Sequence, residues 1–132
     1  MLALAWWLRV VGLLYVFMAV VAIGPRIPIR AEGPAGILER AQAGDATAKF
    51  VVDTWVMIGL YLGAIGVSML VASRTPEQAR VLVWTVLGVE AIGGIGIDVY
   101  KLVRGYRRTP PIVWIGIHSA VIGSGLLCLR GT

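Results

Sequence analysis

The stretch TWVMIGLYLGAIGVSMLVAS, residues 54–73, decides the fold of this chain because its twenty residues include no charge. An α-helix rises about 1.5 Å per residue, so about 20 apolar residues cross the roughly 30 Å hydrocarbon core of a bilayer. The stretch therefore predicts a membrane-spanning helix.

Three other apolar runs have similar length and character. We predict spans over residues 2–23, 50–72, 79–103 and 111–129. Gly24-Pro25 ends the first span, since proline cannot continue the backbone hydrogen-bond ladder, and Pro110-Pro111 suits the start of the fourth. Tryptophan prefers the membrane interface, and every predicted span carries tryptophan near its start: Trp6, Trp7, Trp55, Trp84 and Trp114. A short surface helix over residues 37–43 is predicted in the first connection.

The composition supports the same fold class. Of 132 residues, 58% are hydrophobic and 14% are charged, whereas soluble domains have about 25% charged residues. A soluble protein of this size cannot bury so much apolar surface in one core. We therefore predict an all-α integral membrane protein, in which residues 1–132 form a single four-transmembrane-helix bundle.

The net charge of +5 comes from basic residues that cluster between the apolar runs. No basic face with interleaved aromatic residues is present, so nucleic acid is not an expected partner. Basic flanks of membrane helices instead favour contact with lipid headgroups. Membrane lipids are the predicted partners, and assembly into a homo-oligomer or a larger membrane complex stays open.

Ionisable residues inside predicted spans are costly and are candidate functional residues. The spans that carry Arg9 and Glu90 begin on the same side of the membrane. The depths of the two residues in the membrane differ by only about 6 Å. We predict an Arg9–Glu90 pair, which either holds two helices together or makes Glu90 a titratable coupling or ligand site. The alternative is that Arg9 extends to the headgroups.

A second polar group is predicted toward the other side, from Asp53, Asp98 and His118. Asp98 and Lys101 are three residues apart and share a helix face. Glu90 and Lys101 share one too, because eleven residues make close to three turns. This register predicts that the face with Glu90, Gly94, Ile97 and Lys101 points into the bundle.

His118 has several possible roles: a proton acceptor, a ligand-binding donor, or a histidine hydrogen-bonded to Asp98 or Asp53. Haem held by two histidines is excluded because the chain has one histidine. The nearby sequence Gly93-Gly94-Ile95-Gly96 predicts a loosened or bent helix between Glu90 and Asp98.

No catalytic motif of soluble enzymes is present, and the single cysteine excludes an intrachain disulfide and a multi-cysteine metal site. We predict no catalytic residue, metal or cofactor, and a role other than enzyme is favoured.

Several segments resemble the BphX-like family: WWLRVVG at 6–12, DTWVMIG at 53–59, VWTVLGVE at 83–90 and WIGIH at 114–118. The resemblance covers nearly the whole chain. It implies a small bacterial four-span protein of the plasma (inner) membrane, some relatives of which are encoded near aromatic-degradation genes. It implies no known activity. Arg9, Asp53, Glu90 and His118 lie within the resembling segments.

Three functions follow as hypotheses. The first is a membrane protein that binds a lipid or hydrophobic ligand, or serves as an accessory subunit. The second is a small proton-coupled transporter that uses Glu90. The third is a quinone-linked redox component, in which Asp98 and His118 handle protons.

Overall fold

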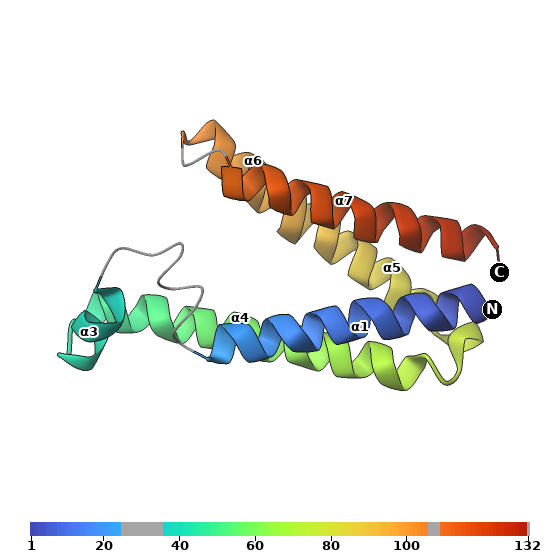
Figure 1. The fold of residues 1–132 in the computed structure, drawn as a ribbon, viewed down its shortest axis with the longest axis horizontal. Helices are drawn as coiled ribbons and strands as arrows, with labels where there is room; N and C mark the ends of the chain where they lie inside the picture. The colour runs from blue at the N-terminus through green and yellow to red at the C-terminus, as the bar shows by residue number, and fades with distance from the viewer. Residues whose placement is uncertain (25–35, 106–108, 132) are drawn as a thin grey trace. The chain divides into compact units, whose positions relative to one another are not determined.

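The computed structural model describes residues 1–24, 36–105 and 109–131, and these residues fold into helices without strands (Figure 1). Four helices among them are long and apolar enough to cross a membrane. The elements in chain order are α1 (Leu2–Ile23), α3 (Ile37–Gln42), α4 (Ala46–Ala72), η1 (Pro76–Gln78), α5 (Arg80–Val89), η2 (Glu90–Ile95), α6 (Gly96–Val103) and α7 (Thr109–Arg130).

The predicted spans agree closely with the observed helices. Helix α1 has the predicted bounds, and α5, η2 and α6 together form the third long helix, Arg80–Val103. Helix α4 begins four residues earlier than predicted because Asp45 caps it, and α7 begins two residues earlier, with Pro110 and Pro111 in its first turn. The short helix predicted at 37–43 is α3. Pro25, Pro28 and Pro34 make the first part of the connection between α1 and α4 unfavourable for a helix. These three prolines lie outside the described residues.

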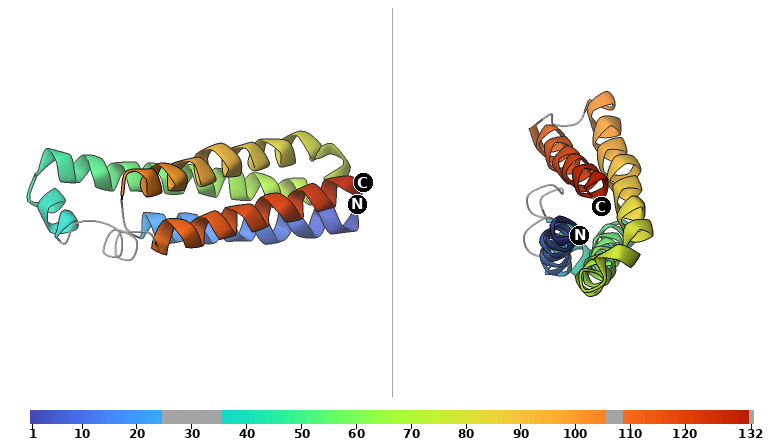
Figure 2. Two further views of the ribbon diagram at one scale, coloured as in Figure 1. Left: turned by 90° about the horizontal axis from the view of Figure 1, so that it is seen from above. Right: turned by 90° about the vertical axis from the view of Figure 1, so that its right-hand side faces the viewer.

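The chain divides into two compact units: a terminal unit of Met1–Val11 and Val71–Thr132, and a central unit of Gly12–Leu70. Within the terminal unit, α7 packs along α5, η2 and α6 (Figure 1). The first turns of α1 lie beside the end of α7 (Figure 2). There the indole Nε1 of Trp7 donates to Ser124 Oγ at 3.0 Å. This hydrogen bond satisfies the polar edge of a tryptophan whose surface is 6% exposed. The single domain predicted for residues 1–132 stays a prediction.

Within the central unit, α1 and α4 run antiparallel and approach closely at small residues. A Cβ placed on Gly66 would lie 2.7 Å from the Gly12 carbonyl oxygen and 2.9 Å from the Val16 backbone nitrogen. A Cβ on Gly59 would lie 2.9 Å from the Cβ of Ala22. Glycine permits this close approach of α1 and α4, because only a hydrogen leaves room for the opposing helix.

The substitution Gly66→Ala is expected to destabilise the pairing of α1 with α4 by about 1–3 kcal/mol, since the backbone it would strike cannot rotate away. Thermal unfolding followed by circular dichroism measures the loss. Gly116→Ala on α7 is the matched control, because no atom of the described residues lies within 4 Å of its added Cβ. Alanine there should leave the melting temperature unchanged or raise it. Equal losses in the two variants would contradict close packing at Gly66.

The start of α4 is fixed by an N-cap. Asp45 Oδ1 accepts from the Ala48 backbone N–H at 3.0 Å, and the Arg40 guanidinium donates to Oδ2. These contacts stabilise the ionised carboxylate, and the backbone hydrogen bond is the largest cause, so the pKa of Asp45 lies below its ordinary value of 3.8. Because the folded-state pKa is lowered, the cap's contribution is present at neutral pH and lost as the pH falls through that lowered value.

We therefore expect Asp45→Ala to lower the melting temperature at pH values above the ordinary carboxyl pKa, and this difference to shrink in acid as the wild-type carboxylate protonates. Melting curves over an acid pH series measure it. Asp45→Asn is the control, since it keeps a capping oxygen but cannot ionise. If the Asp45→Ala difference is the same in acid as at neutrality, the cap does not depend on charge.

Candidate functional site

The third long helix contains an irregular turn between its two carboxylates. From Glu90 to Ile95 the backbone is π-helical, and the Gly96 N–H donates to the Ala91 carbonyl, five residues earlier. Such turns are rare and lie mostly at functional positions. The sequence EAIGGIG favours one because glycine tolerates a widened turn. The loosening predicted at Gly93–Gly96 is therefore a π-helical turn that begins at Glu90 rather than a bend.

This turn sets which side chains share a face. In a regular α-helix, Glu90 and Asp98 would point about 80° apart, because eight residues at about 100° each exceed two turns by that amount. A π-turn takes up about one extra residue, which reduces the rotation between them by about 100° and leaves about 20°. Both carboxylates consequently face α7, and both are buried, at 4% and 2% exposure.

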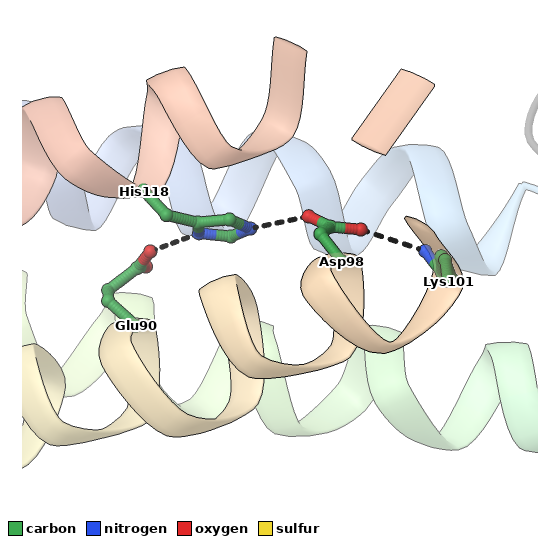
Figure 3. Close-up of polar contacts among 4 residues, drawn as sticks. All are labelled: Glu90, Asp98, Lys101 and His118. Atoms are coloured by element: carbon green, nitrogen blue, oxygen red, sulfur yellow. Dashed lines mark hydrogen bonds and ion pairs between the residues drawn. The ribbon is translucent and has the colours of Figure 1, made fainter. Parts of the chain in front are cut away.

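His118 on α7 lies between these two carboxylates (Figure 3). Its Nδ1 is hydrogen-bonded to Glu90 Oε2. Its Nε2 faces Asp98 Oδ2 at 3.7 Å, which is an electrostatic contact rather than a hydrogen bond. Lys101 Nζ in turn donates to Asp98 Oδ1 at 3.1 Å. We call Glu90, His118, Asp98 and Lys101 the polar chain.

The two ring contacts of His118 depend on where protons lie. A neutral imidazole has one N–H, and its other nitrogen carries a lone pair. A carboxyl group faces each ring nitrogen of His118, and which group donates in these contacts depends on the tautomer of the ring. With a doubly protonated ring and two ionised carboxylates, the four groups of the polar chain would sum to zero charge. The polar chain thus joins an imidazole, an ammonium group and two carboxyl groups in consecutive contact.

Gly94 provides the space for the histidine ring. A Cβ on Gly94 would lie 2.5 Å from His118 Nδ1 and 2.7 Å from Cε1, so no larger residue fits beneath the ring in this position. Trp114, one turn earlier on α7, lies with its ring centroid 6.0 Å from that of His118. Gly94 and Trp114 thus both contribute to the surroundings of the imidazole ring.

The structure agrees with part of the predicted site. It pairs Lys101 with Asp98 and places His118 near Asp98, as the spacing predicted. The predicted inward face is wrong at Ile97, which is 52% exposed, while Asp98 points inward instead. The π-turn explains this correction, because it rotates every residue after Glu90 relative to a regular helix.

The described ion pairs do not include one between Arg9 and Glu90, so this predicted pair is also wrong. Arg9 Nε instead donates to Ser73 Oγ at 3.4 Å, and the guanidinium lies 5.3 Å from the centroid of the Trp6 ring. Glu90 faces His118. Asp53 belongs to the central unit, where it is exposed, and its predicted approach to His118 stays a prediction.

Sequence reasoning missed the Glu90–His118 contact, although a signal for it exists. Glu90 is eleven residues from the start of the predicted third span, and His118 is eleven residues from the end of the fourth. Antiparallel helices bring such positions to equal depth. Within the described part of the chain, no group of three or more histidine, cysteine, aspartate and glutamate residues is arranged to hold a metal ion.

The comparisons with known proteins agree on one family. A sequence model of the BphX-like family matches residues 1–132. The chain is 34% identical over 83 residues to an uncharacterized BphX-like protein of Burkholderia cepacia and, equally, to one of Paraburkholderia xenovorans strain LB400. Each alignment covers 59% of this chain and 56% of the relative, so the chain spans little more than half the length of these relatives. No solved structure matches the chain.

The substitution Gly94→Ala is expected to displace the His118 ring and to lower the free energy of unfolding by about 1–3 kcal/mol, as overpacking of a filled site does. Gly93→Ala is the neighbouring control, because the only atom near its added Cβ is Val89 Cγ1 at 4.0 Å. Nitrogen NMR of the single histidine should show shifted ring signals in Gly94→Ala alone. Unchanged ring signals in that variant would show that the ring does not rest on Gly94.

Proposed function

The chain belongs to the BphX-like family, and we propose that it is a multi-pass protein of the bacterial plasma membrane whose polar chain takes up and releases a proton. The observation that carries this proposal is the position of His118, with a carboxylate at each ring nitrogen.

Membrane insertion is supported by what the long helices leave exposed. Only 17% of the apolar 18-residue stretch of α4, and of α7, is buried. The corresponding share is 39% in α1 and 33% in the third long helix. Large apolar side chains such as Phe17, Phe50 and Ile92 are 64%, 71% and 81% exposed. Apolar area in water costs about 25 cal/mol per Å², so such surfaces are suited to lipid.

Proton exchange is supported by the gradient of exposure along the polar chain. The side chains of Glu90 and Asp98 are 4% and 3% exposed, that of His118 is 18%, and that of Lys101 is 37%. The buried groups are therefore linked, contact by contact, to a cation that reaches the surface near the end of α6. Ionisable residues that face one another inside a membrane protein commonly relay protons or form ion pathways.

Such a centre suits the proton-coupled transporter among the three hypotheses from the sequence. Glycine-rich η2 lies at the centre, and single π-turns inside α-helices are frequent at functional sites. In the quinone-linked alternative the same residues exchange protons, and added quinone should then perturb the histidine signals of the purified protein. Binding of a hydrophobic ligand, or an accessory role in a complex, is compatible with the exposed apolar surface but is not favoured by any particular contact.

The single histidine allows a direct test. Protein labelled with nitrogen-15 in histidine gives ring signals from His118 alone, and these signals distinguish doubly from singly protonated imidazole. If the polar chain exchanges a proton, the ring signals of His118 should change with pH. Glu90→Gln and Asp98→Asn each remove a carboxyl group that faces the ring, so each should alter that change.

Asp53→Asn is the matched control, since it neutralises an exposed carboxylate of the central unit. It should leave the His118 titration unchanged. A ring that keeps one tautomer throughout the pH range, unaffected by Glu90→Gln, would overturn the proposal and leave the polar chain as a structural hydrogen-bond network. Solute flux into proteoliposomes under a proton gradient then distinguishes the transporter from the quinone-linked component. A transporter should show this flux, and Glu90→Gln should abolish it.

A further inference from the structure

The geometry points to a second site in the terminal unit: Arg9, beside Ser73 and Trp6, binds the phosphate of an anionic phospholipid. This inference rests on the membrane placement proposed above but not on the proton chemistry of the polar chain.

Arg9 carries a charge that no carboxylate compensates within the described residues. Its Nε donates to a neutral hydroxyl, Ser73 Oγ, and its guanidinium lies against the neutral Trp6 ring. The described ion pairs instead involve Arg40, Lys101 and His118. Arg9 is nevertheless exposed within an apolar helix, where an arginine without a counter-ion is costly. We infer that an anion other than the described carboxylates of the terminal unit meets this charge.

The contacts that Arg9 does make orient its binding groups. The hydrogen bond from Nε to Ser73 and the cation–π contact with Trp6 restrict the guanidinium, while the two terminal nitrogens, Nη1 and Nη2, have no hydrogen bond to a described residue. These two nitrogens form a planar fork that matches two oxygens of a phosphate. Trp6 is itself 56% exposed, as expected for a ring at a lipid interface.

The surrounding charge selects an anionic lipid. Arg74 follows Ser73 directly, Arg80 begins α5, and Arg130 ends α7, whose last turns contact the first turn of α1. Glu77 is the one acidic residue in the connection between Ser73 and Arg80. This excess of arginine attracts a headgroup with net negative charge. A zwitterionic headgroup also carries a positive group, which the same arginines repel.

Lipid binding can be counted by native mass spectrometry of the protein in a mild detergent, titrated with phosphatidylglycerol or phosphatidylcholine. We expect phosphatidylglycerol to bind more tightly, and Arg9→Gln to weaken its binding about tenfold, as loss of a charge-assisted bidentate contact does. Arg9→Lys keeps the charge but not the planar fork, and should weaken binding by less. Arg104→Gln, at an exposed arginine that ends α6, is the control and should bind as wild type.

Three outcomes would overturn the site: equal binding of the two lipids, unchanged phosphatidylglycerol binding in Arg9→Gln, or an equal loss in Arg104→Gln. If Arg9→Gln does not fold, full binding by Arg9→Lys would overturn the bidentate contact. Glu90→Gln should retain lipid binding, and Arg9→Gln should retain the His118 titration. Failure of this site is therefore distinguishable from failure of the proton-exchange proposal.

Discussion

The need of two buried carboxylates for positive charge governs the structure of the terminal unit. Glu90 and Asp98 lie on one helix and are nearly inaccessible to solvent, and an unpaired carboxylate in that position would cost several kcal/mol. His118 faces both of them, and Lys101 contacts Asp98 from the same helix. The pairing of α7 with the third long helix is therefore specified by these contacts, whereas apolar packing alone would tolerate other registers.

The π-turn and Gly94 are the backbone conditions for this arrangement. Without the extra residue in the turn, Glu90 and Asp98 would diverge and one histidine could not face both. Without a glycine at 94, the ring would be displaced by a Cβ. The π-turn interrupts the regular hydrogen bonds of the α-helix, and the contacts of Glu90 and Asp98 with His118 compensate for that cost. The two features act together, since the turn aligns the carboxylates and the glycine admits the ring between them.

The polar chain and Arg9 differ in whether the protein itself supplies a facing negative charge. His118 and Lys101 contact the carboxyl groups of Glu90 and Asp98, which belong to the same protein. Arg9 meets a hydroxyl and an aromatic ring, which orient it but do not neutralise it. The first arrangement suits exchange of a proton, because its net charge changes with one proton. The second suits a bound anion, because its charge is permanent.

The sequence alone determined the helices, since an uncharged stretch such as 54–73 admits one kind of regular structure, and prolines and Asp45 mark where helices begin or end. It also indicated the candidate functional residues, because Glu90, Asp98 and His118 interrupt apolar runs. Only the tertiary structure decided that His118 faces both carboxyl groups. Regular helical geometry turned Ile97 inward, whereas one π-helical turn brings Asp98 inward instead, because a change of about 100° midway along a helix redirects every side chain beyond it.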